Sequence, residues 1–222
     1  NKIDSENYKS KLVFIPNTPK VAVYLMYKKG LKLDSKNKCF LKGYGAYGSD
    51  ITSNYLSKNG GLMYYKSLLD EDFVVAIAYI RGGQFGGFKF HKEGRNQYRK
   101  NVYNDFIKVA KYLINQNITE SQRLAIYGRS AGGLLVGNVI NMEPELCKLA
   151  ILGVPFVMPY HAMLDKVNPL AYESHYEFGN PFDKKEREEI KSSNAYSEAE
   201  KNPWIEILDP TVKYNSLKLS QK

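Results

Sequence analysis

The sequence has 222 residues, of which 43% are hydrophobic and 25% charged, as is usual for a globular protein. Its longest apolar run, residues 73–80, is far shorter than the roughly 20 residues that cross a bilayer. Residues 1–10 are polar and contain no apolar signal-peptide core. We therefore expect one domain over residues 1–222, located in the cytoplasm and without a membrane partner.

Charge and cysteine content exclude further classes of site. The net charge of +9, from 32 basic and 23 acidic residues, would suit an anionic partner. However, the basic residues are spread along the chain apart from a modest cluster at 89–100, and no zinc-finger or RNA-binding pattern occurs. We expect a solvated basic surface and no nucleic-acid partner. Two cysteines, Cys39 and Cys147, provide neither a disulfide framework nor a metal-ligand spacing, so we expect free thiols and no metal.

Apolar strand-like segments alternate with helical patterns along the chain. We predict strands over residues 21–27, 39–44, 73–80, 124–127, 149–154 and 205–208, and helices over 62–69, 106–113, 134–142 and 184–191. The segment 73–80 is apolar throughout and rich in β-branched residues, as in a central strand buried on both faces. This alternation indicates an α/β fold with a mostly parallel sheet and helices on both faces. In such folds, active sites gather at the carboxyl ends of the strands.

A glycine motif follows the second predicted strand. Gly43, Gly45 and Gly48 match G-x-G-x-x-G, a pattern of dinucleotide-binding turns. Those folds need an acidic residue about twenty positions on, at the end of the next strand. Here the acids at 70–72 precede that strand, which ends in the arginine and glycines of 81–83. Two tyrosines inside the turn would also crowd a pyrophosphate. We interpret the motif as a tight turn and expect no NAD, FAD or other cofactor.

The segment 128–133, GRSAGG, contains a G-x-S-x-G motif between a predicted strand and a predicted helix. This context is typical of a nucleophile elbow, a strained strand-to-helix turn that exposes the serine hydroxyl above a sheet. Glycines on either side avoid the Cβ clashes of such a turn. We predict that Ser130 is a nucleophile. The backbone N–H of Ala131, at the helix start, would stabilise a developing oxyanion.

A serine nucleophile also needs a base and a residue that orients it, in the chain order Ser, Asp, His. Asp209 directly follows the predicted strand 205–208, where the orienting acid belongs. The alternative is that it is a surface acid in a turn. The three histidines, His91, His161 and His175, all precede Asp209, so these 222 residues do not complete the triad in that order.

Several segments occur in the order found in one peptidase family. They are GYGAYG (43–48), IRGG (80–83), GRSAGG (128–133), NMEPELCKLAILGVPFV (141–157), FGNP (178–181) and DPTVKY (209–214). With these motifs the sequence resembles the catalytic domain of the prolyl oligopeptidase family, most closely its oligopeptidase B branch. The resemblance implies an α/β-hydrolase fold and a serine peptidase that cleaves short peptides without a cofactor. It also implies a β-propeller, as a partner domain within a longer protein.

The resemblance assigns roles to individual residues. Ser130 would be the nucleophile and Asp209 the triad acid. Tyr44 would donate its phenol to the oxyanion beside the Ala131 N–H. Tyr47 would contact the substrate.

Specificity is where the sequence departs from the family. The two carboxylates with which oligopeptidase B selects Lys or Arg fall on Ser174 and Tyr176. Glu173 and Glu177 stand next to them and are candidate substrate contacts. The arginine of proline-cleaving members falls on Thr211. The preferred substrate residue therefore stays open.

Several alternatives remain for the function. The chain is a fragment of a larger peptidase whose histidine lies beyond residue 222, or it is a degenerate pseudo-peptidase that binds without cutting. The intact elbow favours the first. An esterase or lipase would share the elbow, and a binding module for anionic partners would explain the net charge.

Overall fold

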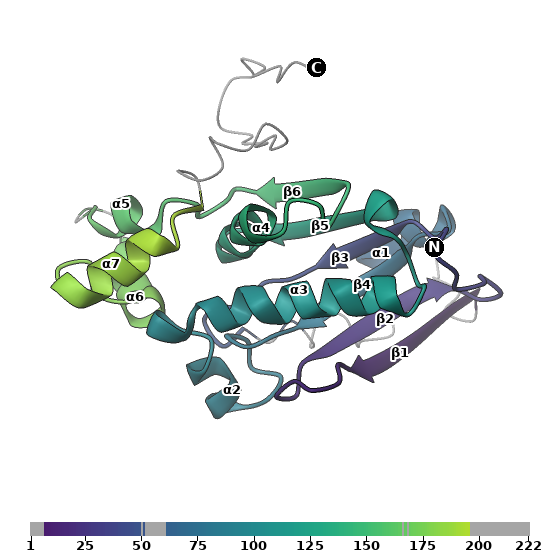
Figure 1. Cartoon of the computed structure of the whole chain (residues 1–222), viewed down its shortest axis with the longest axis horizontal. Coiled ribbons are helices and arrows are strands. Elements are labelled where there is room, and N and C mark those ends of the chain that lie inside the picture. Colours follow the sequence, from purple (N-terminus) through teal and green to yellow (C-terminus); the bar gives the residue numbers. More distant parts are fainter. Residues whose placement is uncertain (1–6, 50, 52–60, 166, 168, 196–222) are drawn as a thin grey trace, which may run out of the picture.

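The computed structural model describes residues 7–49, 51, 61–165, 167 and 169–195 (Figure 1). Within this part, six strands form one sheet in the order β1-β2-β4-β3-β5-β6. The strands are β1 (Tyr8–Phe14), β2 (Ala22–Lys28), β3 (Cys39–Lys42), β4 (Val74–Tyr79), β5 (Leu124–Arg129) and β6 (Leu149–Gly153). The β4–β3, β3–β5 and β5–β6 pairings are parallel, whereas β1–β2 and β2–β4 are antiparallel. The predicted α/β fold with a mostly parallel sheet is confirmed.

The helices of the described residues agree with the predicted ones in four places. They are α1 (Gly61–Asp70), α2 (Phe88–Lys92), α3 (Lys100–Asn115), α4 (Ala131–Met142), α5 (Pro159–Met163), α6 (Pro169–Phe178) and α7 (Lys184–Ser192), with short 3-10 turns η2 (Asn96–Tyr98) and η3 (Ser121–Arg123). Helices α1, α3, α4 and α7 were predicted. Strand β1 and helices α2, α5 and α6 were not. The predicted strand 205–208 lies outside the described residues, as does Asp209.

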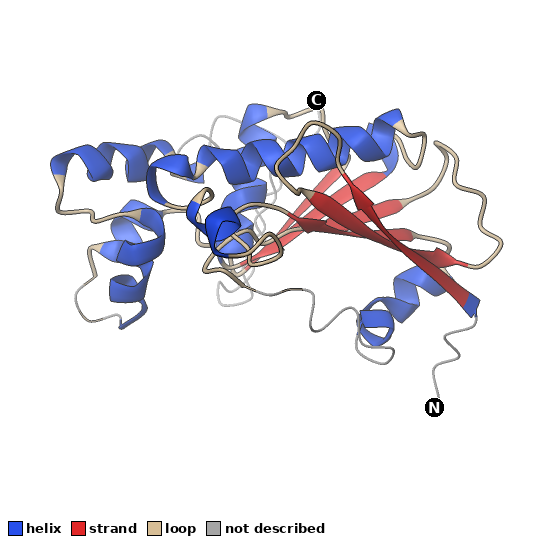
Figure 2. Cartoon of the chain, turned by 90° about the horizontal axis from the view of Figure 1, so that it is seen from below, coloured by secondary structure: helices blue, strands red, loops and turns tan. Residues whose placement is uncertain are grey.

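Helices cover both faces of the sheet (Figure 2). Strand β4 is buried along its whole length, and its side chains alternate between the two faces. One set, which includes Val74, Ala76 and Ala78, joins the core formed with α3 and α4. The other set, which includes Val75 and Ile77, packs with α1. This two-sided burial is the reason for the uninterrupted apolar sequence of β4.

The parallel strands β3, β5 and β6 end at the same edge of the sheet. The register pairs Lys42 of β3 with Tyr127 of β5, and Arg129 of β5 with Gly153 of β6. The loops that follow these three strands are therefore neighbours. Helices α5, α6 and α7 lie beyond this edge, at one end of the molecule (Figure 1). The two sequence motifs singled out above, the glycine turn and the serine motif, meet here.

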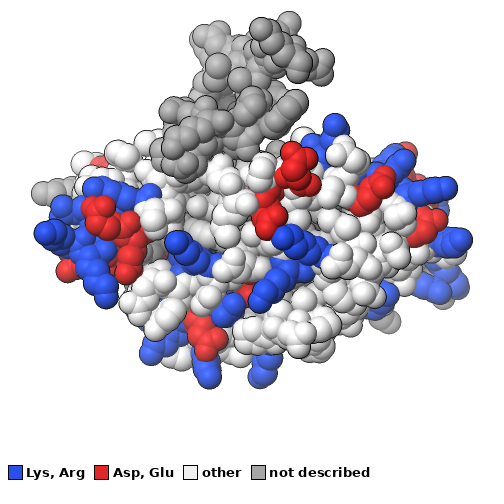
Figure 3. All heavy atoms as spheres, viewed as in Figure 1, with Lys and Arg blue, Asp and Glu red and all other residues white. Residues whose placement is uncertain are grey.

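The surface agrees with the scattered charge of the sequence. Lys and Arg side chains are interspersed with Asp and Glu over the face shown in Figure 3. No helix of the described residues is long and apolar enough to cross a membrane. Within the same residues, no three His, Cys, Asp or Glu side chains come together as a metal site would require.

Candidate active site

Ser130 occupies the turn between β5 and α4, and its backbone is strained. Its φ of 55° and ψ of −119° lie outside the regions that non-glycine residues ordinarily adopt. The residue is nevertheless exposed, so its side chain is reachable from solvent. An exposed serine in a strained strand-to-helix turn is the geometry predicted for a nucleophile elbow.

The glycines around Ser130 are required by close backbone contacts. A Cβ on Gly128 would lie 1.9 Å from the carbonyl oxygen of Gly132, well inside van der Waals contact. A Cβ on Gly132 would lie 2.8 Å from the carbonyl oxygen of Gly43, in the turn after β3. A Cβ on Gly133 would lie 2.5 Å from the Cβ of Pro155. The motif therefore allows the elbow, the glycine turn and the loop after β6 to pack directly on one another.

The backbone of Ser130 is also held by the loop after β6. Its N–H donates to the carbonyl oxygen of Gly153 at 2.9 Å, and its own carbonyl oxygen accepts from the N–H of Phe156 at 3.0 Å. Between these partners, Val154 adopts a φ of 43°, a rare conformation for a β-branched residue. This turn brings both hydrogen bonds to the backbone of Ser130. Ser130 is thus held by the end of β6 and the loop that follows it, and not only by its own turn.

The glycine motif after β3 forms a tight turn beside the elbow. The N–H of Gly43 donates to the carbonyl oxygen of Tyr127 at 3.1 Å, which joins the turn to β5. A Cβ on Gly43 would lie 2.5 Å from the ring of Phe106, so no larger residue fits. Gly45 and Gly48 both have a positive φ, of 64° and 57°. This confirms the interpretation of the motif as a turn.

Tyr44 lies against the start of α4. Its ring would be 3.3 Å from a Cβ on Gly132, and it packs in a cluster that contains Ala131. Burial raises the pKa of the Tyr44 phenol above its usual value, and the neighbouring Tyr47 adds to this. The phenol is therefore a protonated hydrogen-bond donor at neutral pH. No described residue accepts a hydrogen bond from the Ala131 N–H, the first of the helix. The two predicted oxyanion donors, Tyr44 and the Ala131 N–H, thus lie together at the start of α4, directly after Ser130 in the chain.

The three histidines are held elsewhere. Nε2 of His91 lies 2.8 Å from Oε2 of the buried Glu177. His175 uses its Nε2 to bond the carbonyl oxygen of Met163, at 3.2 Å. His161 is exposed on α5. Among the described residues, none of them forms a hydrogen bond with Ser130, so the base of a triad is not found in this part of the chain.

Aromatic side chains line the surface beside the glycine turn. Tyr47, 40% exposed, adopts a φ of 56° and places its hydroxyl 3.2 Å from Oγ of Ser174. Its ring meets the edge of Phe178 at 5.7 Å between centroids. Phe156, from the loop after β6, packs on Phe178 in turn, at 5.3 Å. The predicted substrate contact Tyr47 is thus part of an aromatic wall built by three separate segments.

The two glutamates predicted as substrate contacts have different positions. Glu173 is exposed, and its charge is near enough to Tyr47 to help raise the pKa of that phenol, although burial is the main cause. Glu177 is completely buried, with one oxygen beside His91 and the other 3.4 Å from Nη1 of Arg99. Both oxygens of Glu177 are therefore used inside the protein. Its partners could not be recognised from the sequence, because they lie in a charged stretch that is typical of a protein surface.

The IRGG segment has a structural explanation. The guanidinium of Arg81 donates from Nε and Nη2 to the two carboxylate oxygens of Asp105, both at 2.7 Å. Asp105 is fully buried on α3, and it also accepts the backbone N–H of Arg81 at 3.2 Å. A Cβ on Gly82 would lie only 2.2 Å from the carbonyl oxygen of Gly45. The segment thus packs directly against the glycine turn. The bidentate pair of Arg81 and Asp105 fixes the segment to α3.

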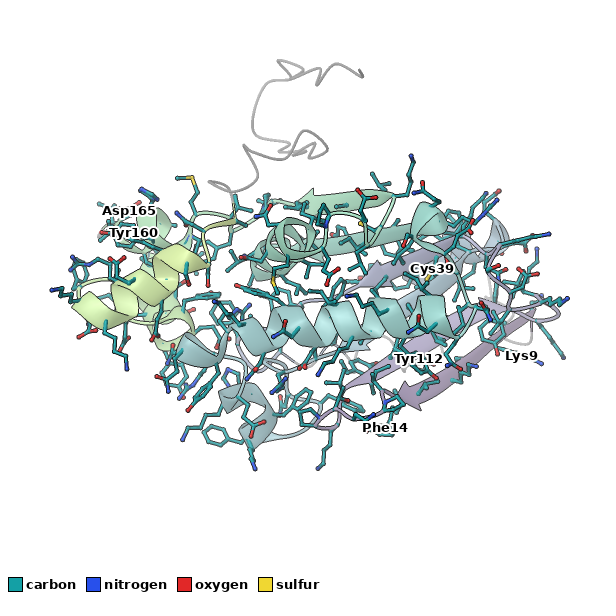
Figure 4. The ribbon with its side chains drawn as sticks, viewed as in Figure 1. Lys9, Phe14, Cys39, Tyr112, Tyr160 and Asp165 are labelled. Carbon is teal, nitrogen blue, oxygen red and sulfur yellow. The ribbon has the colours of Figure 1, made fainter. Side chains whose placement is uncertain are left out.

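The cysteines take no part in the site. Cys39 lies at the amino end of β3, in the region of Tyr112 and far from the end of the molecule that carries Tyr160 and Asp165 (Figure 4). Burial raises the pKa of the Cys39 thiol to about 12 and that of Cys147 to about 11. Both are therefore neutral thiols at physiological pH, which is unsuitable for a nucleophile or a metal ligand.

Comparisons with known proteins agree with this arrangement. The sequence profile of the prolyl oligopeptidase family matches residues 62–210. Dipeptidyl aminopeptidase BI of Pseudoxanthomonas mexicana is 37% identical over 82% of this chain and 25% of its own length. Oligopeptidase B from Leishmania major is 34% identical with a TM-score of 0.73, over 86% of this chain and 26% of that one. A post-proline cleaving enzyme from Rickettsia typhi is 31% identical with a TM-score of 0.76, over 89% and 28%.

This chain spans about a quarter of the length of these relatives. Over that part, the likeness in structure confirms the predicted α/β-hydrolase fold. The strained serine and the loop after β6 fall within residues 62–210, which the family profile matches. The chain belongs to the prolyl oligopeptidase family.

Proposed function

We propose that this chain carries the nucleophile and oxyanion site of a serine peptidase that hydrolyses peptide bonds in short peptides. The observation that carries the proposal is the strained, exposed Ser130, followed by the Ala131 N–H, which has no acceptor among the described residues, and by the ring of Tyr44 packed at the start of α4. A serine with no chemical role would have no need of a backbone conformation that costs about 1–3 kcal/mol. The named relatives are peptidases, which supports the reaction class.

In the proposed reaction, Oγ of Ser130 attacks the scissile carbonyl carbon while a histidine accepts the hydroxyl proton. The carbonyl oxygen becomes an oxyanion that the Ala131 N–H and the Tyr44 phenol stabilise. The intermediate collapses, the C–N bond breaks, and the histidine returns the proton to the leaving amine. Water then hydrolyses the acyl-enzyme by the reverse sequence of proton transfers. The raised pKa of Tyr44 keeps its donor proton in place throughout.

Because none of the three histidines forms a hydrogen bond with Ser130 within the described residues, the histidine of the proposed mechanism comes from outside those residues. We assign Asp209, which lies outside those residues, as the acid that orients it. A histidine and a β-propeller on further segments of a longer protein, as the family resemblance implies, would complete this site.

Within the aromatic wall, the partly exposed Tyr47 is the proposed contact for the substrate side chain, and the buried Phe178 packs against its ring. Exposed Glu173 stands near this wall and offers a negative charge to the substrate. Glu177 is not carried forward as a direct contact, since its carboxylate is buried and shared by His91 and Arg99.

Two other functions remain as outcomes of the test. A pseudo-peptidase would keep the fold and bind peptides without forming an acyl-enzyme. An esterase would use the same elbow on acyl esters. The close fit of the matched segments to peptidases supports amide cleavage over both.

The test is covalent labelling of the 222-residue chain by a fluorophosphonate, followed by intact mass and peptide mapping. Free imidazole is added as a substitute for the absent base. We expect one adduct, on Ser130, which forms faster with imidazole and is abolished by Ser130→Ala. An adduct-free chain would support the pseudo-peptidase. Where labelling succeeds, hydrolysis of acyl esters without any cleavage of peptide amides would favour the esterase.

A further inference from the structure

Helix α6 presents one buried face to the glycine turn. Ser174, Glu177 and Phe178 are spaced i, i+3 and i+4, so they share a side of the helix, and all three are buried. Ser174 and Phe178 both contact Tyr47, through its hydroxyl and its ring. Glu177 lies between them in the sequence and does not touch the turn directly. It reaches the turn through Arg99.

Arg99 precedes α3, and only 3% of its surface is exposed. Its Nη1 donates to the carbonyl oxygen of Gly45 at 2.7 Å and to that of Gly94 at 3.2 Å. The same nitrogen lies 3.4 Å from Oε1 of Glu177, and the guanidinium carbon sits 4.8 Å from the centre of the Phe178 ring. One cation therefore joins the turn, the loop before α3 and helix α6.

Glu177 is shared between two partners. Oε2 takes the contact with Nε2 of His91 at 2.8 Å, while Oε1 faces Arg99. The ring of His91 also packs on the turn itself, because a Cβ on Gly48 would lie 3.4 Å from it. A completely buried carboxylate needs such partners, since an unpaired charge there would cost several kcal/mol. Glu177 of α6 is thus linked to the turn at two places, at Gly45 through Arg99 and at Gly48 through His91.

Gly45 directly follows Tyr44, so the position of its backbone affects where Tyr44 lies in the proposed oxyanion site. Its carbonyl oxygen is confined on two sides. Arg99 binds it, and a Cβ on Gly82 would approach it to 2.2 Å, so the IRGG segment packs directly against it. This oxygen belongs to the peptide between Gly45 and Ala46, so the backbone is held one residue beyond Tyr44. The position of Tyr44 within the turn thus depends on contacts made by the residue that follows it.

We propose that Arg99 is a positioning residue for the oxyanion tyrosine: it holds the carbonyl group of Gly45, the residue after Tyr44, and through Glu177 it couples this turn to helix α6. The inference rests on the proposed function of Tyr44 as an oxyanion donor. Arg99 does not touch the reacting atoms. As a consequence of this coupling, the aromatic wall and the oxyanion site form one rigid unit. Binding of a ligand at the wall therefore affects the oxyanion site.

Electrostatics gives this role a measurable signature. Burial, the largest influence, raises the pKa of the Tyr44 phenol, the negative charge of Glu177 raises it further, and the positive charge of Arg99 lowers it. Removing Arg99 should therefore raise the pKa of Tyr44, whereas neutralising Glu177 should lower it. A residue that merely supports the fold would behave differently. Loosening the site would hydrate the phenol, and its pKa would fall in both variants.

The experiment is an NMR titration of the chain with 13C at the Cζ of tyrosine, with Tyr44→Phe to assign the signal. In Arg99→Met we expect the pKa of Tyr44 to rise by roughly half a unit or more, and in Glu177→Gln to fall. Arg99→Lys keeps the charge and should stay close to the wild type. The matched control is Arg95→Met, which removes a nearby guanidinium that lies over Tyr176 instead.

A fall of the Tyr44 pKa in both Arg99→Met and Glu177→Gln, or an equal rise in Arg95→Met, would overturn the proposal. If Arg99→Met does not fold, Arg99→Gln replaces it, because this variant also removes the positive charge and should raise the pKa of Tyr44. The titration does not depend on whether Ser130 reacts. Failure of Ser130 labelling with the predicted shifts would reject the proposed function alone, and labelling without these shifts would reject Arg99 alone.

Discussion

A Cβ on Gly128 would lie 1.9 Å from the carbonyl oxygen of Gly132, one turn further along the elbow. Neither backbone can move away without displacing Ser130 between them. We therefore expect Gly128→Ala to lower the free energy of unfolding by about 3 kcal/mol or more, measured by urea denaturation. Gly153→Ala, on the neighbouring strand, is the control: its Cβ would come no nearer than 3.3 Å to another atom, the side-chain hydroxyl of Tyr127. Equal stability of the two variants would contradict the geometry of the elbow.

The strain at Ser130 can be measured in the same way. Glycine accepts a φ of 55° with a ψ of −119° without penalty, whereas alanine does not. We expect Ser130→Gly to be more stable than Ser130→Ala by about 1 kcal/mol in urea denaturation. Both variants remove the hydroxyl, so the comparison isolates the backbone. A glycine variant that is the less stable of the two would show that the turn is relaxed.

The ion pair of Arg81 and Asp105 should be important for stability, because the aspartate is fully buried and accepts three hydrogen bonds from one residue. Asp105→Asn leaves the guanidinium without its counter-charge and should cost about 3–5 kcal/mol of unfolding free energy. The exposed pair of Arg123 with Glu120 is the control, and Glu120→Gln should change stability by less than about 0.5 kcal/mol. Comparable losses in both variants would contradict this account.

The buried thiols predict how stability depends on pH in alkaline solution. Burial raises the pKa of Cys39 to about 12 and of Cys147 to about 11, while unfolded cysteines titrate near pH 8.5. The folded state therefore holds protons that the unfolded state has lost. The stabilisation is complete below about pH 8.5 and falls as pH rises toward 11–12, by at most about 1.4 kcal/mol per pH unit for each thiol.

The measurement is urea denaturation at pH 8, 9 and 10, with the wild type beside Cys147→Ala. The variant should lose stability less steeply between pH 9 and 10, because one of the two thiols no longer titrates. A free energy of unfolding that is constant from pH 8 to 10, or identical slopes in the two proteins, would show that the thiols are accessible.

Local patterns were sufficient to predict the elements and motifs around the site. Strand β4 is buried on both faces, so its apolar sequence identified it, and the helical spacing of apolar residues identified α3. Strand β1 was missed because it is a largely exposed edge strand with little apolar periodicity. The glycine turn and the elbow were recognised because each depends on residues that are close in sequence.

The supporting contacts of the site could not be predicted in this way. Tyr47 and Ser174 are 127 residues apart, and Arg99 and Glu177 are 78 apart. Nothing local to Glu177, in a polar helix, indicates that its carboxylate is buried. Only the fold brings it to His91 and Arg99, and this changed its role from a substrate contact to a structural one. Asp209 stays a prediction, since it lies outside the described residues.

The most direct test of the central claim is the rate at which a fluorophosphonate labels Ser130 in the presence of imidazole, compared between the wild type and Tyr44→Phe. If the phenol stabilises the oxyanion, its loss should slow labelling by about 10²-fold or more. Tyr64→Phe, in a side chain that is exposed on α1, should label at the wild-type rate. Equal rates in the wild type and Tyr44→Phe, or an adduct that persists in Ser130→Ala, would contradict the assignment of this site.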